Sequence, residues 1–425
     1  MLSVGLMSGT SMDGVDAALL ETDGSENHIT ELGQASLSYT PEFKLLLKAT
    51  EYVIRRNAGN LSAAEACYAH AIQTYLKEEL RLPEAHQAQQ LAALRQALPG
   101  ETLSLNAVIQ HSTRLHGELV KQLLQKTGQA KERIAVVGYH GQTFYHHPAA
   151  KISVVLGNGQ ALANDLGLTV VNDFRAQDVA AGGQGAPFAP LFHYALARRD
   201  QRIPAAIVNC GGIANLTLVQ SSEENDLIAF DTGPGNGLID RLVRQRTGGK
   251  ESMDTDGQYG RRGRIHASVF QALWEKALVK EGQNYLAQLP PKALDQGDLK
   301  LISELDALSL EDACATLEAF TAETVVSSLD LIQADSPPQW ILAGGGWKNP
   351  VIRQQLEERL QRRAGKNVKV LLAEDVGWNS QALEAQIFAY LAVRSLQMQP
   401  LSLPGTTGVP YPMQGGTTYL PQQEI

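Results

Sequence analysis

The chain has 425 residues, of which 44% are hydrophobic and 19% charged, and its formal net charge is −9. This length exceeds what one hydrophobic core usually organises, so two domains of a soluble globular protein are expected. The negative charge argues against nucleic acid and against an anionic membrane as partner, because both bind basic surfaces. No apolar run approaches the ~20 residues that a membrane-spanning helix needs. A small-molecule ligand is therefore expected.

Cysteine usage and the start of the chain bear on its compartment. Cys67, Cys210 and Cys314 lie far apart and form no CxxC pair, so neither a disulfide framework nor a zinc cluster is implied. The sequence begins directly as a strand, without a basic leader segment. We expect a reduced, cytoplasmic protein.

Residues 1–22 predict a strand, a tight loop and a second strand, because apolar residues alternate with period two on both sides of SGTSMDG. The loop offers uncrowded N–H groups, three hydroxyls and a carboxylate, which suit a polyphosphate with its magnesium. It is no Walker A loop, because Gly-Lys-Ser/Thr does not follow, and it opens no helix. An ordinary hairpin turn is the alternative interpretation.

The region that begins at Pro41 reads as mostly helical, with Ser62 as a candidate cap for the helix that runs through Leu76. The Gln/Ala-rich stretch 84–100 predicts a surface insertion of weak helicity and no visible chemistry. Residues 178–187 predict an irregular loop.

Two polar groups follow predicted buried strands. His140 and Gln142 come after the apolar run 134–137, and Asp173 and Arg175 come after a second such run. Open α/β sheets bind ligands at the carboxyl ends of their strands, so all four are candidates for substrate contact. The alternatives are a structural hydrogen bond for His140 and a simple ion pair between Asp173 and Arg175.

The strand, turn and strand recur at residues 205–219, with Gly211, Gly212 and Asn215 at the turn. This recurrence predicts a protein of two like-built halves. Two such turns that face each other across a cleft would grip a nucleotide from both sides.

A third glycine cluster contains Gly344 and Gly345 and lies between a strand and a helix that starts near Pro350. Consecutive glycines let a flat ring approach the backbone, so adenosine is expected here.

Asp231 ends the apolar run 227–231 and precedes a helix that begins at Leu238. A carboxylate at this place can act as a general base if burial raises its pKa. A capping aspartate is the alternative, but Asn236 is the expected N-cap. We therefore favour the general base.

With these motifs in place, the sequence resembles the anhydro-N-acetylmuramic acid kinase family of the sugar kinase, Hsp70 and actin superfamily. The matching segments span nearly the whole chain in family order: GLMSGTSMDGVD, GYHGQT, VVNDFRAQDVAAGGQGAP, NCGGIANLT, FDTGPGN, LAGGGWKNP and SQALEAQIFAYLA. The resemblance implies an α/β fold of two RNase H-like (actin-like ATPase) domains with a nucleotide cleft between them. We expect domain I at 1–170 and 395–425 and domain II at 171–394.

The resemblance also implies an activity. It is an ATP- and Mg²⁺-dependent kinase that opens the 1,6-anhydro ring of 1,6-anhydro-N-acetylmuramic acid and phosphorylates O6, which gives N-acetylmuramic acid 6-phosphate in murein recycling. Asp231 would activate the attacking water, and Asp13 would lie near magnesium. The residues implied in nucleotide binding are Gly9, Thr10, Ser11, Met12, Asp13, Gly14, Val15, Asp16, Gly211, Gly212, Asn215, Gly344 and Gly345. Those implied in sugar binding are His140, Gln142, Asp173, Arg175 and Glu384.

The chain departs from the family pattern in two places, one divergent motif and the Gln/Ala-rich insertion at 84–100, which makes it longer than the compact members. Its substrate stays open. Family members often carry Pro-Lys-Ser-Thr-Gly-Arg-Glu where this chain has Pro291-Lys-Ala-Leu-Asp-Gln-Gly-Asp298. A related branch acts on levoglucosan, and the sequence does not distinguish the two substrates. An ordinary sugar-hydroxyl kinase and a chaperone-like nucleotide switch are the two rival functions, although no segment is left over for a peptide-binding domain. The family suggests a homodimer.

Overall fold

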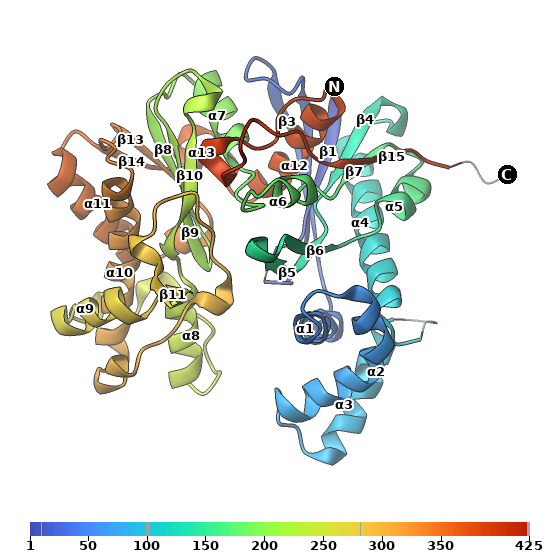
Figure 1. The fold of residues 1–425 in the computed structure, drawn as a ribbon, viewed down its shortest axis with the longest axis horizontal. Coiled ribbons are helices and arrows are strands. Elements are labelled where there is room, and N and C mark those ends of the chain that lie inside the picture. The colour runs from blue at the N-terminus through green and yellow to red at the C-terminus, as the bar shows by residue number, and fades with distance from the viewer. Residues whose placement is uncertain (10, 99, 101, 281, 423–425) are drawn as a thin grey trace. The chain divides into compact units, whose positions relative to one another are not determined.

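The computed structural model describes residues 1–9, 11–98, 100, 102–280 and 282–422 (Figure 1). The chain forms two compact units. Unit 1 comprises residues 1–185, 382–402 and 409–425, and unit 2 comprises residues 186–381 and 403–408. The expected boundaries were 170/171 and 394/395. Residues 171–185 and 382–394 instead fall in unit 1, and residues 403–408, expected in domain I, fall in unit 2. For residues 382–394 the physical reason is the packing of residues 383–396 on the sheet of unit 1.

Unit 1 contains a six-stranded sheet in the order β15-β7-β4-β1-β2-β3. Its strands are β1 (Leu2–Met7), β2 (Gly14–Thr22), β3 (Ile29–Ser38), β4 (Ile134–Tyr139), β7 (Val170–Asn172) and β15 (Thr417–Tyr419). β2 is antiparallel to both β1 and β3, whereas β4 runs parallel to β1 and β7 parallel to β4. β5 (Gln142–His147) and β6 (Ile152–Leu156) form a separate antiparallel pair.

Unit 2 contains a five-stranded sheet in the order β10-β9-β8-β13-β14. Its strands are β8 (Ala205–Cys210), β9 (Ile213–Val219), β10 (Ile228–Pro234), β13 (Gln339–Ala343) and β14 (Lys369–Leu372), and β11 (Val279–Lys280) pairs with β12 (Gln283–Asn284). The directions repeat those of β3-β2-β1-β4-β7, with three consecutive antiparallel strands followed by two strands parallel to the third. The predicted α/β fold of two like-built halves is confirmed.

Helices cover both faces of the sheet of unit 1. They are α1 (Pro41–Arg56), α2 (Leu61–Glu78), α3 (Glu84–Gln96), α4 (Leu105–Thr127), α5 (Gly159–Leu166), α6 (Ala176–Ala180) and α12 (Leu383–Leu396). Leu19 belongs to the core that α4 shares, whereas its neighbour Ala18 packs against Ala385 of α12. Successive strand residues point to opposite faces, so α4 and α12 lie on opposite sides of the sheet. α1, α2 and α3 lie together beyond one end of it (Figure 1).

The sheet of unit 2 is covered in the same way. Its helices are α7 (Pro190–Arg199), α8 (Gly237–Arg246), α9 (Ala267–Lys276), α10 (Leu310–Leu331), α11 (Pro350–Ala364) and α13 (Pro404–Thr407). Leu216 and Leu218 of β9 share a core with α10 and α11. Thr217 points to the other face, where its hydroxyl bonds to Nδ1 of His193 in α7 at 2.9 Å.

Two local predictions were wrong, and a third, the irregular loop 178–187, was wrong only for residues 178–180. Asn60, not Ser62, caps α2, because its side chain accepts the N–H of Ala63 at 3.0 Å. The stretch 84–100 contains a regular helix, α3, whose Leu94 is fully buried and which contacts α1 and α2. α6 occupies the beginning of the predicted loop 178–187. In the second case tertiary packing stabilises a segment that the amphipathic pattern does not reveal.

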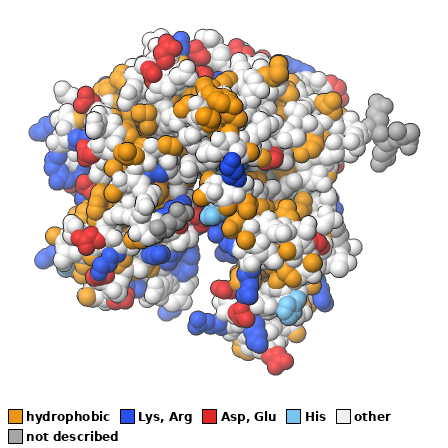
Figure 2. Space-filling model, in the orientation of Figure 1, with side chains coloured by type: hydrophobic (Ala, Val, Ile, Leu, Met, Phe, Trp, Pro, Cys, Tyr) orange, Lys and Arg blue, Asp and Glu red, His pale blue; other side chains and the backbone are white. Residues whose placement is uncertain are grey.

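The surface and the cysteines agree with the composition. None of the described helices is long and apolar enough to cross a membrane. Acidic and basic side chains are intermixed over the face shown in Figure 2. The three cysteines are free thiols.

Candidate functional site

The first glycine-rich turn joins β1 to β2 in unit 1. Met12 donates its N–H to the carbonyl of Gly9 at 3.0 Å and adopts a φ of 55°. The buried Ser8 donates its hydroxyl to Oε1 of Gln142 at 2.8 Å, and Nε2 of Gln142 donates to the carbonyl of Gly9 at 3.0 Å. A positive φ at a non-glycine residue is costly and persists only where the surroundings hold it. Gln142 therefore supports the turn, and Thr10 lies outside the described residues.

Asp13 is the candidate magnesium ligand of this turn. Its carboxylate pairs with the ammonium group of Lys44, and the two side chains are 62% and 36% exposed. Magnesium bound to a nucleotide takes only one or two protein carboxylates, since phosphate and water supply its other ligands. One exposed carboxylate at the turn fits this requirement. No group of three or more His, Cys, Asp or Glu side chains within the described part of the chain would hold a metal by itself.

The remaining predicted residues of the turn differ in what they expose. Val15 is 1% exposed and belongs to the core, so only its backbone is available to a ligand. Ser11 is exposed, and Asp16 is exposed but accepts the hydroxyl of Ser36 at 2.6 Å. The hydroxyl and the carboxylates at the surface are thus the side chains that can meet a ligand.

His140 and Arg175, predicted from separate segments, are in contact. Nδ1 of His140 donates to the carbonyl of Gly141 at 2.8 Å, and Nε2 accepts from the guanidinium of Arg175 at 3.0 Å. Arg175 also donates to the carbonyl of Gly185 at 2.5 Å. Burial, together with the charge of Arg175, lowers the pKa of His140 to about 3. The imidazole is therefore neutral at physiological pH, and it orients Arg175 rather than transferring protons.

Replacing His140 with phenylalanine tests this role. Phenylalanine can keep the packing of the ring on Phe388, whose centroid lies 4.5 Å away, but it offers no acceptor to Arg175. We expect KM for the sugar to rise roughly tenfold while KM for ATP is unchanged. Steady-state kinetics with His147→Phe, an exposed neighbour, is the control. An unchanged KM for the sugar would remove His140 from substrate positioning.

Asp173 and Glu384 complete the predicted sugar residues of unit 1. Asp173 adopts a φ of 56°, and its carboxylate accepts the N–H of Ala176. Loss of hydration raises the pKa of Asp173, against the effect of that hydrogen bond. Glu384 lies exposed in the first turn of α12 and interacts electrostatically with Asp16 and Arg175. The structure thus brings the predicted sugar residues and Asp16 to neighbouring positions.

Two glycines determine where α12 lies. A Cβ at Gly5 of β1 would overlap the backbone of Ala385, and one at Gly138 of β4 would overlap the carbonyl of Phe388. The absence of side chains at both positions lets the helix rest directly on the two strands. Because Glu384 lies in the first turn of α12, this contact determines the distance of Glu384 from the sheet.

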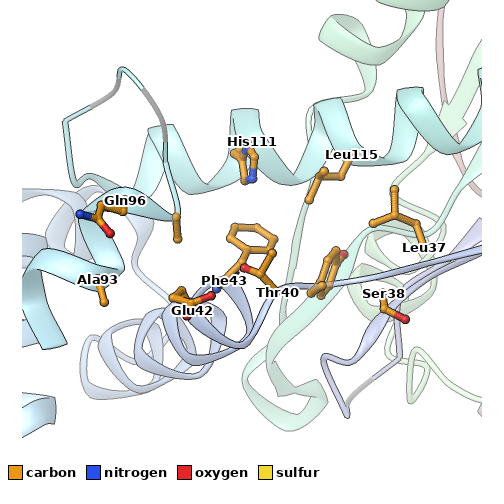
Figure 3. Close-up of a pocket in the computed structure, with 11 residues that line it drawn as sticks. Leu37, Ser38, Thr40, Glu42, Phe43, Ala93, Gln96, His111 and Leu115 are labelled. Carbon is orange, nitrogen blue, oxygen red and sulfur yellow. Dashed lines mark hydrogen bonds between the residues drawn. The ribbon is translucent and has the colours of Figure 1, made fainter.

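A hollow of about 440 Å³ lies at the end of β3, beside the first turn (Figure 3). It is lined by Leu37, Ser38, Tyr39, Thr40, Glu42, Phe43, Ala93, Gln96, Ala97, His111 and Leu115. His111 stands edge-on to Phe43, with 4.8 Å between the ring centroids. Tyr39 links the hollow to the turn, because its N–H donates to the carbonyl of Asp13 at 2.9 Å. The Gln/Ala-rich stretch thus forms a wall of this hollow through α3.

The second glycine-rich turn, between β8 and β9 in unit 2, supports the start of α8. The carbonyl of Gly211 accepts the N–H of Asn236 at 2.9 Å, and that of Gly212 accepts the N–H groups of Gly235 at 3.0 Å and Gly237 at 3.2 Å. A Cβ at Gly235 would overlap the carbonyl of Gly211. The side chain of Asn236 accepts none of the described N–H groups of α8, so its predicted capping role was wrong. The carbonyls of Gly211 and Gly212 accept the N–H groups at the start of α8 instead.

Asp231 is one of three polar residues aligned across neighbouring strands. Asn215 of β9 lies opposite Asn209 of β8 on one side and opposite Asp231 of β10 on the other. Directly opposed residues in antiparallel strands point to the same face. A Cβ at Gly344 would lie 2.5 Å from Oδ1 of Asn209, so the third glycine cluster borders this row. Asn209 was missed by sequence analysis, although its place one strand pair from Asn215 follows from the hairpin register.

A segment distant in sequence holds Asp231 in place. Oδ2 of Asp231 accepts the N–H of Leu294 at 2.8 Å, its own N–H donates to the carbonyl of Lys292 at 3.2 Å, and its carbonyl accepts the hydroxyl of Tyr285 at 2.7 Å. The ammonium of Lys292 donates to the carbonyl of Tyr285 at 3.0 Å and lies 4.4 Å from the centroid of that ring. Burial lowers the pKa of Lys292 to about 8, against the charge of Asp231.

This segment, residues 285–294, overlaps the stretch 291–298 where the sequence departs from the family motif. The contacts with Asp231 are made mainly by backbone groups of Lys292 and Leu294, so they do not require the family's side chains. The carbonyls of Gln296 and Leu299 further accept the guanidinium of Arg241 at 3.3 and 2.5 Å, which ties the segment to α8.

Comparison with known proteins identifies the family of the chain. Residues 60–421 match a family model described as anhydro-N-acetylmuramic acid kinase. Three relatives bear that name. One from Zymomonas mobilis is 39% identical, and the match covers 98% of this chain and 99% of the relative. One from Azorhizobium caulinodans is 40% identical, with 99% of this chain and 100% of the relative covered, and one from Rhodospirillum rubrum is 40% identical, with 98% of this chain and 93% of the relative covered.

One solved structure, of (R)-2-hydroxyglutaryl-CoA dehydratase component A from Acidaminococcus fermentans, aligns over 93% of this chain and 99% of its own with 10% identity and a TM-score of 0.43. A likeness at that level bears on neither activity nor ligand. The sequence matches, by contrast, cover nearly the whole chain. The chain belongs to the anhydro-N-acetylmuramic acid kinase family.

Proposed function

We propose that this protein opens the 1,6-anhydro ring of 1,6-anhydro-N-acetylmuramic acid with water and transfers the γ-phosphoryl group of ATP to O6, which gives N-acetylmuramic acid 6-phosphate. The observation that carries the proposal is the grouping of family-matched residues at corresponding turns of two sheets with the same strand order. Unit 1 contributes a phosphate turn and polar residues suited to a sugar, and unit 2 contributes the polar row that contains Asp231.

In this proposal Asp231 is the general base. It takes a proton from water as the water oxygen attacks the anomeric carbon, the bond between that carbon and O6 breaks, and O6 accepts the phosphoryl group while ADP leaves. A general base must be held within hydrogen-bond reach of its proton donor. The hydrogen bond from Leu294 to Asp231 and the opposing strand that carries Asn215 supply that fixed position.

The nucleotide would be held by the three glycine-rich turns. Backbone N–H groups of Gly9–Asp16 and of Gly211–Gly212 would meet phosphates, with Asn215 beside them, and the turn at Gly344 and Gly345 would meet adenosine. Mg²⁺ at Asp13 would neutralise phosphate charge when bound. Lys44, which pairs with Asp13, would then be displaced toward the phosphates.

Replacing Gly345 with alanine tests the adenosine position. A Cβ there meets no described atom within 4 Å, so the protein itself has room for the methyl group and its Tm should not change. A bound nucleotide ring would meet that methyl group, so KM for ATP is expected to rise roughly tenfold. KM for the sugar serves as the internal control. An unchanged KM for ATP would place adenosine elsewhere.

The sugar would contact Arg175, Asp173 and Glu384, with His140 orienting Arg175. Gln142 was predicted as a sugar ligand, but its amide bonds to Ser8 and Gly9, so we assign it to the support of the phosphate turn. We further propose, from the family resemblance, a cytoplasmic location. The resemblance also favours a homodimer, and sedimentation analysis of the purified chain would test that oligomeric state.

One assay tests the proposed function. ADP release is measured with 1,6-anhydro-N-acetylmuramic acid, levoglucosan, glucose and N-acetylglucosamine in heavy-oxygen water. We expect turnover with the first sugar and the heavy oxygen at its anomeric hydroxyl. Preference for levoglucosan would move the substrate to the smaller anhydrosugar. Turnover of glucose or N-acetylglucosamine alone would indicate an ordinary sugar-hydroxyl kinase, and slow ATP hydrolysis that no sugar affects would indicate a nucleotide switch.

A further inference from the structure

Glu318 of α10 is a fully buried carboxyl group that has no part in the proposed reaction. Its Oε1 accepts the side-chain amide of Asn349 at 2.6 Å. Its Oε2 is also buried and finds no donor among the described residues. An ionised carboxylate with one oxygen unsatisfied is costly in such a place. A proton on Oε2 would remove that cost if an acceptor lay beside it.

Asp254 is that acceptor. Its two carboxylate oxygens accept the N–H groups of Tyr259 at 2.9 Å and Gly260 at 3.0 Å. Its side chain also interacts with that of Glu318. A Cβ at Gly260 would overlap Oε2 of Glu318, so only glycine allows this approach. Burial, and to a smaller extent Asp254, raise the pKa of Glu318 to about 8. The hydrogen bond from Asn349 and the charge of Arg261 act in the opposite direction and lower it.

Asn349 connects this acid pair to the third glycine cluster. Its Oδ1 accepts the N–H groups of Val351 at 2.9 Å and Ile352 at 3.4 Å at the start of α11, which turns its amide nitrogen toward Glu318. Its backbone N–H donates to the carbonyl of Gly346 at 3.2 Å. The turn of three glycines therefore ends at Asn349, whose side-chain oxygen caps α11 and whose side-chain nitrogen donates to Glu318.

We infer that Glu318 is a positioning residue for the nucleotide: sharing one proton with Asp254, it holds Asn349 and thereby the turn Gly344–Gly346 in the shape that receives adenosine. The inference rests on the proposed function, which places adenosine at that turn. Loss of the shared proton puts two negative charges side by side in a buried place. Their repulsion would release Asn349 and loosen the turn, so nucleotide affinity should fall in alkaline solution.

The other ionisable groups near the pair do not produce the same effect. Arg261 interacts with Glu318 from the adjoining loop and acts to lower the pKa of Glu318, and burial raises the pKa of Cys314 of α10. Burial raises the pKa of Asp240, which interacts with Asp254, to about 6, so Asp240 is already ionised at pH 7. Burial lowers the pKa of Lys292 to about 8. Because Lys292 lies beside Asp231, its loss of charge should change kcat rather than ADP affinity.

The experiment compares wild type, Glu318→Gln and Glu318→Ala, with Glu311→Gln, at a partly exposed site on the same helix, as the matched control. ADP affinity is measured by calorimetry at pH 7 and pH 9, and KM for ATP, KM for the sugar and kcat are measured at pH 7. In wild type and Glu311→Gln, we expect ADP affinity to fall roughly tenfold from pH 7 to pH 9. Glu318→Gln can accept from Asn349 and donate to Asp254 without titrating, so its affinity should match wild type at pH 7 and stay constant.

Glu318→Ala should raise KM for ATP roughly tenfold at pH 7 and leave kcat and KM for the sugar close to wild type. If this variant does not fold, the flat pH dependence of Glu318→Gln still supports the inference. A fall in ADP affinity of Glu318→Gln that parallels wild type would overturn it. ADP binding that does not change with pH in wild type would overturn the inference alone, whereas failure of wild type to bind ADP at either pH would overturn the proposed function as well.

Discussion

Asp231→Asn should lower ring-opening turnover roughly 10²- to 10⁴-fold, because an amide cannot take the proton of the attacking water. The side-chain oxygen of asparagine can still accept the N–H of Leu294, so the loop 285–294 should keep its position. ADP affinity and Tm should therefore stay close to wild type. Initial rates of ADP release with saturating 1,6-anhydro-N-acetylmuramic acid, together with calorimetric titration of ADP, measure the two effects separately.

Asp226→Asn is the matched control for this prediction. Asp226 is an exposed carboxylate shortly before β10 and accepts the hydroxyl of Ser221 at 2.6 Å, so its loss should leave turnover unchanged. Near-normal turnover in Asp231→Asn would exclude Asp231 as the general base. A large loss of turnover in both variants would point to a general effect of charge on the unit rather than to proton transfer.

The architecture could be predicted because its signals are local. The alternation around the Gly9 turn, its recurrence around Gly211 and the apolar run before Gly344 each depend on short stretches of sequence, and each marks a strand that the structure contains. The shared order of the two sheets then follows from the repetition of one plan. The residues at those turns could be nominated as a site because open α/β sheets bind ligands at the carboxyl ends of their strands.

The support of the site could not be predicted because it depends on contacts between distant segments. Asp231 bonds to Leu294, 63 positions further along the chain, and no local pattern reports such a pairing. The predicted cap at Asn236 failed for the same reason, because carbonyls of the turn at Gly211 and Gly212 approach the helix from another strand pair. Glu318 in turn reads as an ordinary helical glutamate until Asp254 and Asn349 are placed beside it.

Replacing Gly138 with alanine is expected to destabilise unit 1 by about 3 kcal/mol or more, since the new Cβ would overlap the carbonyl of Phe388. Neither β4 in the middle of the sheet nor the buried helix α12 can move without disturbing its neighbours. Tm should fall by roughly 6–12 °C, as measured by calorimetry. KM for the sugar should rise as well, because α12 carries Glu384, and Phe388 packs on His140.

Gly9→Ala in the same unit separates a true clash from a general cost of losing glycine. The nearest described atom to a Cβ at Gly9 is the hydroxyl oxygen of Ser11 at 3.8 Å, so this variant should keep the Tm of wild type. Equal Tm values for both variants would mean that α12 does not rest on β4, and the position assigned to Glu384 above the sheet would fail with that contact. A lower Tm for Gly138→Ala with an unchanged KM for the sugar would keep the packing but exclude Glu384 and His140 from sugar binding, because a shift of α12 must move both.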